Sequence, residues 1–123
     1  MKILIVDDSQ LVKNLLVKVF KQYLPGVFVF LANNGEEAFQ IYQEEKPDYV
    51  LTDLLMPIKT GQELLQLIRD SEYKAKVIVM SADIQKSTRE EIEAMDVIAF
   101  INKPLNNEKA AYLIDLLKGE YHA

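Results

Sequence analysis

The sequence predicts an α/β domain in which a five-stranded parallel sheet is covered by helices on both faces. Two observations support this prediction. Short apolar runs rich in β-branched residues, typical of strands buried on both faces, alternate with amphipathic segments of helical length. The alternation repeats along the whole chain, and right-handed crossovers between parallel strands then favour a doubly wound sheet.

The first strand–helix unit has clear limits. Ile3–Val6 is an unbroken apolar run, and the helix that follows is predicted from Gln10 to Tyr23, before the helix-ending pair Pro25–Gly26. The second strand is expected at Val27–Leu31. The helix should direct one apolar stripe at the sheet, made of Leu11, Leu15, Leu16, Val19 and Phe20.

The middle of the chain repeats this arrangement. A second helix is predicted to begin after Asn34–Gly35 and to end before Lys46–Pro47. The third strand follows at Tyr49–Thr52, and Thr60 precedes the third helix as its expected cap. The residues expected to face the sheet on these two helices are Ala38, Phe39, Ile41 and Tyr42, followed by Leu64, Leu65, Leu67 and Ile68.

The last two units complete the fold. Val77–Met80 and Ile98–Ile101 are the fourth and fifth predicted strands. The fourth helix should start near Ser87, and the fifth should run from Asn107 to Lys118, where Gly119 stops it. Their inward residues are expected to be Ile92 and Met95, and then Ala111, Leu113, Ile114 and Leu117.

Composition excludes several functional classes. A chain of 123 residues, half of them hydrophobic, has the size of one domain, and we expect a single domain over residues 1–123. No cysteine and one histidine, His122, argue against thiol chemistry and histidine-based catalysis or metal binding. The net charge of −5 argues against nucleic acid as a partner.

No apolar run is long enough to span a membrane, and Asp7–Asp8 interrupts the N-terminal run, so a cytoplasmic location is expected.

Polar residues follow four of the predicted strands, at the edge where ligands bind in doubly wound sheets. They are Asp7, Asp8 and Ser9, then Asp53, then Ser81, and finally Lys103 with Pro104. Two unit charges 4 Å apart repel by about 4 kcal/mol at an effective dielectric constant near 20. Three converging carboxylates would therefore need a cation, and ligands with only oxygen donors suit Mg²⁺.

Each residue also has a simpler interpretation when it is taken alone. Asp8 or Ser9 could serve only as the N-cap of the first helix, and Asp53 could cap or turn the chain before Met56–Pro57. A serine after a strand, as at position 81, usually caps or turns, and Lys103 alone is an ordinary solvated lysine. The functional signal lies in the placement of all these groups on one edge.

In their order and spacing, five segments resemble the receiver domain of two-component response regulators, particularly the single-domain, chemotaxis-type (CheY-like) members. The segments are ILIVDDS, ANNGEEAF, PDYVLTDLLMP, VIVMSA and AFINKP. The resemblance covers essentially the whole chain, and it implies a flavodoxin-like sheet with strand order 2-1-3-4-5.

The resemblance also implies a phosphorylation site. Asp53 would accept a phosphoryl group from a histidine kinase in a Mg²⁺-dependent reaction. Asp7 and Asp8 would form the metal-binding acid pair, Asp8 as a direct ligand and Asp7 through water. Asp53 and the backbone carbonyl of Leu55 would complete the protein ligands.

Three further positions would connect this site to an output face. Lys103 would pair with a phosphoryl oxygen, and its bond to Pro104 is expected to be cis. Ser81, at the switch hydroxyl position, would move toward the phosphorylated aspartate and leave space into which Phe100 can turn. This would alter the face formed by the fourth helix, fifth strand and fifth helix. Without the resemblance, an ordinary half-buried strand aromatic is the simpler interpretation of Phe100.

These expectations describe a signalling switch and not an enzyme: a phosphoacceptor that assists its own phosphotransfer and autodephosphorylation. The expected partners are a sensor histidine kinase and a downstream target, such as the flagellar motor switch or a phosphatase, and a monomer is expected. An alternative is a receiver excised from a longer regulator.

Two other protein classes use related sheets. A Mg²⁺-dependent phosphohydrolase of the haloacid dehalogenase type also forms an aspartyl phosphate, but its nucleophile follows the first strand in a D-x-D-x-T arrangement that Asp7–Asp8–Ser9–Gln10 does not fit. A nucleotide- or flavin-binding domain needs a Gly-rich or hydroxyl-rich phosphate loop at that point, where Asp7–Asp8 would repel phosphate.

The sequence departs from the family pattern at a few positions. Leu55 and Asp83 lie two residues after Asp53 and Ser81, at positions that influence acyl phosphate hydrolysis in this family. Leu55 offers no polar group to orient water and Asp83 would repel or redirect it, so hydrolysis slower than with Asn at position 55 is predicted. Asp96 stands where the family usually has Gly. Asp tolerates a left-handed backbone better than most other non-Gly residues, so a strained or rearranged turn is predicted there. The loop at 58–61 is altered with its Thr60 cap retained.

Overall fold

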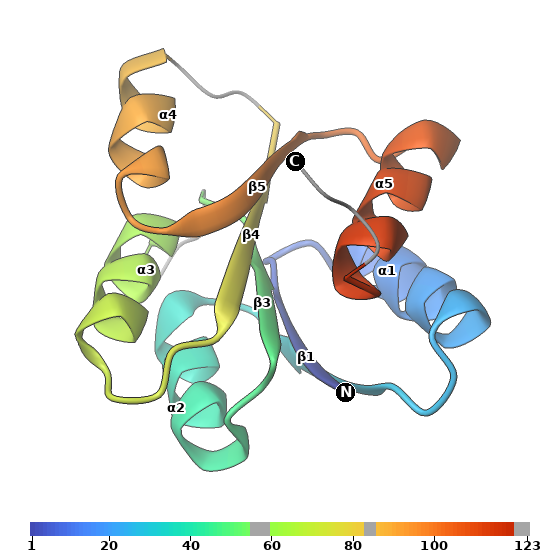
Figure 1. Cartoon of the computed structure of the whole chain (residues 1–123), viewed down its shortest axis with the longest axis horizontal. Coiled ribbons are helices and arrows are strands. Elements are labelled where there is room, and N and C mark those ends of the chain that lie inside the picture. Colours follow the sequence, from blue (N-terminus) through green and yellow to red (C-terminus); the bar gives the residue numbers. More distant parts are fainter. Residues whose placement is uncertain (55–59, 83–85, 120–123) are drawn as a thin grey trace.

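Five strands alternate with five helices in the computed structural model, which describes residues 1–54, 60–82 and 86–119 (Figure 1). The elements are β1 (Lys2–Val6), α1 (Gln10–Tyr23), β2 (Phe28–Ala32), α2 (Gly35–Glu45), β3 (Tyr49–Thr52), α3 (Gly61–Asp70), β4 (Lys76–Ser81), α4 (Lys86–Glu93), β5 (Val97–Asn102) and α5 (Asn107–Leu117). Every element that the sequence predicts is present, and the predicted limits differ from the observed ones by a single residue at most.

The five strands form one sheet in the order β2-β1-β3-β4-β5, which confirms the expected topology. All neighbouring strands are parallel, so their carboxyl ends meet at the same edge. In the pairing of β1 with β3, Val6 lies opposite Thr52. The residues that follow these two, Asp7 and Asp53, therefore leave the sheet side by side.

Two apolar layers hold the helices on the sheet. Figure 1 shows α1 and α5 on one face and α2, α3 and α4 on the other. The first layer includes Leu16, Phe20 and Leu113, which belong to one buried cluster with the inward residues of the central strands. The second includes Leu64 and Ile92 with the opposite faces of the same strands. Burial of each such side chain stabilises the fold by about 1.5–3 kcal/mol.

The predicted apolar stripe of α1 is wrong at its first two members. Leu11 and Leu15 are 80% and 45% exposed, whereas Lys13 is almost completely buried and donates a hydrogen bond to the side-chain oxygen of Asn33. The buried side of the helix instead includes the row of Leu16 and Phe20, four residues apart. A residue one position before such a row is rotated from it by about 100° and points away from the sheet. Ala111 of α5, which was also expected to face inward, is exposed, because it lies four residues before the exposed Asp115 on the same side of the helix.

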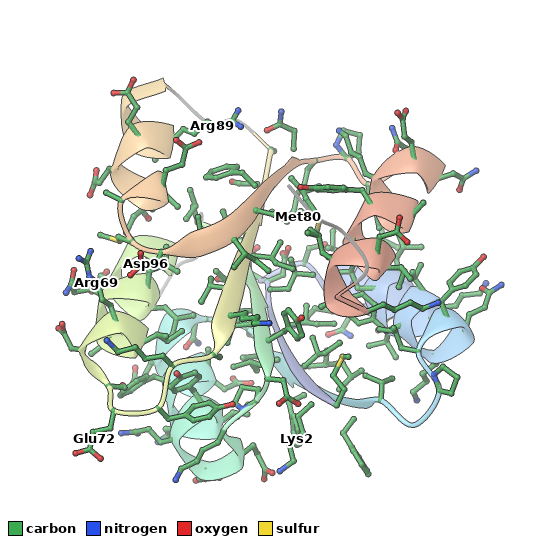
Figure 2. All side chains as sticks on the ribbon, viewed as in Figure 1. Lys2, Arg69, Glu72, Met80, Arg89 and Asp96 are labelled. Carbon is green, nitrogen blue, oxygen red and sulfur yellow. The ribbon has the colours of Figure 1, made fainter. Side chains whose placement is uncertain are left out.

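Two local predictions are confirmed. Thr60 caps α3 in a reciprocal capping box: its side-chain oxygen accepts from the N–H of Glu63, and the Glu63 carboxylate accepts from the N–H of Thr60 at 3.0 Å. Asp96 has φ of +61°, in the left-handed region that favours glycine. Arg69 of α3 donates to the carbonyl of Ala94 at 3.0 Å, which ties the turn before Asp96 to a helix (Figure 2). None of the helices that the structure describes is long and apolar enough to cross a bilayer.

Candidate functional site

The polar side chains selected from the sequence meet at the carboxyl edge of the sheet. They are Asp7 and Asp8 after β1, Asp53 after β3, Ser81 at the end of β4 and Lys103 after β5. Backbone hydrogen bonds just beyond the strands bring them together. The Asp53 N–H donates to the Val6 carbonyl and the Lys103 N–H donates to the Ser81 carbonyl, each at 2.9 Å. The bond between Lys103 and Pro104 is cis, as expected.

The three aspartates form a compact acidic cluster. One carboxylate oxygen from each of Asp7, Asp8 and Asp53 lies within 4.8 Å of the other two. Asp7 and Asp53 are only 2% and 7% exposed, whereas Asp8 faces solvent. The Ser9 N–H donates to Asp7 Oδ1 at 2.9 Å, and Asp8 makes no side-chain hydrogen bond within the described part of the chain. Buried carboxylates require compensating cations or donors, which the neighbouring strand ends supply.

Lys103 is the cation of this cluster. Its Nζ lies 2.6 Å from Asp7 Oδ2 and 2.8 Å from Asp53 Oδ2. Burial by itself would lower the pKa of Lys103, but hydrogen bonds to Asp53 and Asp7, together with their charges, raise its pKa above the ordinary 10.5. Lys103 is therefore charged at neutral pH, and it balances one of the three carboxylates.

Both carboxylate oxygens of Asp53 are held by donors. Ser81 Oγ donates to Oδ1 at 3.0 Å, and Lys103 donates to Oδ2. Ser81 is buried, so this contact is shielded from water. Charge-assisted hydrogen bonds of this kind orient the carboxylate more strongly than neutral ones do.

Phe100, on β5, lies on the same face of the sheet as Ser81. It pairs with Val79, two residues before Ser81 on β4, and is half-buried. Arg89 lies on α4 (Figure 2). Its guanidinium is 5.4 Å from the Phe100 ring centroid, and its Nε donates to the Glu93 carboxylate at 3.1 Å. Sequence reasoning missed Arg89. Its only sequence signal is the four-residue spacing to Glu93, which is typical of an exposed helix pair.

Two residues singled out from the sequence, Leu55 and Asp83, lie outside the described residues. The expected role of the Leu55 carbonyl as a metal ligand therefore stays a prediction. So do the effects of Leu55 and Asp83 on hydrolysis.

The donor set fits a hard divalent cation. It offers carboxylate oxygens from three residues, with no nitrogen or sulfur donor, and such sets favour Mg²⁺ over softer metals. After Lys103 is counted, the three aspartates carry two formal negative charges in excess, which one divalent cation would balance.

A doubly wound parallel sheet with three acids, a lysine and a hydroxyl at its carboxyl edge defines a class of signalling domains that accept phosphoryl groups. The chain belongs to the family of response regulator receiver domains, whose family model matches residues 3–115. Receiver domains are phosphorylatable switches of two-component signalling, and they bind Mg²⁺ at an acidic site. Membership of this family favours the receiver interpretation over the phosphohydrolase and nucleotide-binding alternatives considered above.

Several known proteins are similar to this chain. It is 34% identical to the probable C4-dicarboxylate response regulator DctR of Bacillus subtilis over 95% of the chain, but it spans only 52% of that protein. It is 30% identical to the chemotaxis protein CheY of Halobacterium salinarum, with 84% of each protein covered. The response regulator domain of Thermotoga maritima CheB superposes with a TM-score of 0.83 at 28% identity, covering 97% of this chain and 94% of that one.

Proposed function

We propose that Asp53 is the phosphoacceptor of this chain and that Lys103, Ser81, Asp7 and Asp8 support the transfer. One observation carries the proposal. The two oxygens of Asp53 are held by a serine hydroxyl and a lysine ammonium, in contact with an acidic cluster that fits Mg²⁺. This arrangement presents a fixed nucleophile beside the groups that an incoming phosphoryl group needs.

In the transfer, a carboxylate oxygen of Asp53 attacks phosphorus and a new oxygen–phosphorus bond forms. The bond to the donor breaks: the phosphorus–nitrogen bond of a phosphohistidine, with imidazole leaving, or the phosphorus–oxygen bond of acetyl phosphate, with acetate leaving. Lys103 and Ser81 then donate to phosphoryl oxygens instead of to the carboxylate. They now contact the Asp53 carboxylate at 2.8 and 3.0 Å, so both donors are within reach of a phosphoryl group attached to it.

The roles within the acid pair follow from their contacts. Asp8 faces solvent and would hold Mg²⁺ directly, together with Asp53. Asp7 is engaged by Ser9 and Lys103, which favours a role through water. Bound Mg²⁺ supplies positive charge that neutralises the transferring phosphoryl group.

The output step is proposed to run through Ser81 and Phe100. A shift of the Ser81 hydroxyl toward the phosphoryl group would open space on the face of β4 and β5 where Phe100 lies. Phe100 carries the Arg89 contact, so a turn of its ring would also change α4. A cation–π contact at such a partly exposed place is worth about 0.5–1 kcal/mol, small enough for phosphorylation to overcome.

The phosphodonor is proposed to be a sensor histidine kinase. An apolar cleft of about 380 Å³ adjoins Lys103, and its lining includes Leu11, Leu15 and Leu105. An exposed apolar surface beside the acceptor is a docking surface for a protein that brings its phosphohistidine to Asp53. The similarity to CheY supports a chemotaxis output, such as the flagellar motor switch or a phosphatase.

The test is the intact mass of the protein after treatment with acetyl phosphate and Mg²⁺. The wild type should gain one phosphate, with the gain lost in EDTA and in Asp53→Asn. Asp115→Asn, which changes an exposed aspartate on α5, is the matched control and should label normally. Equal labelling of Asp53→Asn would place the acceptor elsewhere. Multiple turnover of p-nitrophenyl phosphate would instead indicate a phosphohydrolase.

A further inference from the structure

Lys109, in the first turn of α5, contacts the backbone on both sides of Lys103. Its Nζ donates to the carbonyl of Asn102 at 2.7 Å and to the carbonyl of Pro104 at 3.4 Å. Its backbone N–H donates to the side chain of Asn106, the N-cap of the helix, at 2.8 Å. Lys109 therefore connects the start of α5 to both ends of the segment that carries Lys103.

The placement of this lysine has an electrostatic cost that the two carbonyls offset. A cation in the first turn of a helix lies near the positive end of the helix dipole, where acidic residues are preferred. The Lys109 side chain turns back from the helix and uses its ammonium on backbone oxygens of the β5–α5 loop. Within the described part of the chain, it forms no ion pair with a carboxylate.

We propose that Lys109 is a positioning residue for Lys103. This inference rests on the proposed function of Asp53 as the acceptor. Lysine has a flexible four-carbon stem, so where its ammonium can reach depends on where its backbone is held. The backbone of Lys103 is held by its own N–H on Ser81 and by Lys109 on the two flanking carbonyls.

The consequence is a mechanical link between α5 and the phosphorylation site. With Lys109 in place, the Lys103 ammonium stays near Asp7 and Asp53, at the 2.6 and 2.8 Å contacts of the structure. Without Lys109, the loop gains freedom and the ammonium spends less time in reach of a phosphoryl oxygen. The aspartates follow β1 and β3, so the metal-binding side chains should stay in place without this link.

The test compares Lys109→Met and Lys109→Arg with Lys118→Met, which alters an exposed lysine at the other end of α5. The rate of labelling by acetyl phosphate should fall about fivefold in Lys109→Met, the loss that one hydrogen bond of ordinary strength predicts. The rate in Lys109→Arg, which keeps donors for both carbonyls, and in Lys118→Met should stay within about twofold of wild type. Mg²⁺ affinity, measured by calorimetry, should not fall in any variant.

A second measurement does not depend on phosphorylation. By NMR, hydrogen exchange of the Lys103 amide, which bonds Ser81, should accelerate about fivefold in Lys109→Met, while exchange at Ala99, deeper in β5, stays constant. In a Lys103→Met background, Lys109→Met should not slow labelling further, because the effect acts through Lys103.

The inference would be wrong if Lys109→Met showed the labelling rate and the Lys103 amide exchange rate of the wild type. It would also be wrong if Lys109→Met slowed labelling as much in the Lys103→Met background as in the wild type. A loss of both Mg²⁺ affinity and Ala99 protection in Lys109→Met would overturn it too, because this would indicate that Lys109 supports the fold in general. Absence of labelling at Asp53 in the wild type would instead refute the proposed function, and the exchange measurement would then decide this inference.

Discussion

Gly61 lies so close to Asp53 that a Cβ atom at position 61 would stand 2.3 Å from the Asp53 carbonyl oxygen. The same atom would be 2.7 Å from the Cα of Leu54, and the Gly61 N–H donates to the Leu54 carbonyl at 3.2 Å. The obstacles are backbone atoms, which cannot rotate out of the way as a side chain would. The start of α3 therefore packs directly on the backbone that carries the proposed phosphoacceptor.

Gly61→Ala should both destabilise the protein and slow its phosphorylation. Overpacking against backbone typically costs about 1–3 kcal/mol, and the relief of this clash must move the end of β3. Urea unfolding and the rate of labelling by acetyl phosphate measure the two effects. Gln62→Ala, at the next position of the same helix, serves as control. Wild-type stability and rate in Gly61→Ala would mean that the two backbones separate at no cost.

Asp8→Asn should stabilise the metal-free protein and abolish its response to Mg²⁺. The Asp8 carboxylate lies within 4.8 Å of those of Asp7 and Asp53, so its neutral replacement removes like-charge repulsion. A relief of about 1 kcal/mol corresponds to a rise of about 4 °C in Tm for a domain of this size. In calorimetric scans, Mg²⁺ should raise the Tm of the wild type and of Asp115→Asn but not that of Asp8→Asn. A Tm of Asp8→Asn that still rises with Mg²⁺ would remove Asp8 from the metal site.

Tyr42→Phe should lower stability at neutral pH and reduce the loss of stability at high pH. The buried Tyr42 hydroxyl donates to the carbonyl of Tyr73 and accepts from the N–H of Ala75 at 3.1 Å, so its removal should cost about 1–3 kcal/mol. Burial raises the pKa of Tyr42 above 10.0, and the Ala75 N–H offsets only part of this rise. The folded state thus holds the phenolic proton more tightly, and this contribution to stability is lost as the pH rises above 10.

The difference in the free energy of unfolding between wild type and Tyr42→Phe should accordingly become smaller as the pH rises above 10. Urea unfolding across this range measures the difference. The pKa of Tyr73 is raised as well, chiefly by burial, and its contribution has the same sign in both proteins. A constant difference between the two proteins from neutral pH to the highest value would show that Tyr42 ionises equally in both states.

Leu55→Asn should accelerate hydrolysis of the acyl phosphate on Asp53. An amide at position 55 would supply the polar group for orienting water that leucine lacks. The lifetime of the phosphorylated protein after removal of acetyl phosphate measures the rate, and Leu55→Met is an apolar control of similar volume. An unchanged lifetime in Leu55→Asn would contradict the prediction.

Much of the fold could be read directly from the sequence because its signals are local. Unbroken apolar runs such as Ile3–Val6 mark buried strands, and Thr60 with Glu63 marks the start of α3 within four residues. Asp7, Asp53 and Lys103 could be selected as a group because parallel strands place their carboxyl ends at one edge. Asp96, at a position where the family usually has Gly, predicted a strained or rearranged turn, and the structure shows that its backbone is left-handed.

The contacts that turn these elements into a site depend on register and on the rotation of each helix, which are set by packing between distant segments. Packing alone determined that Leu11 faces solvent and Lys13 the interior. It also brought Arg89 over Phe100 and placed Lys109 across the loop that carries Lys103. A side chain at the surface of a helix has several directions open to it, and only the neighbour supplied by the rest of the chain selects one.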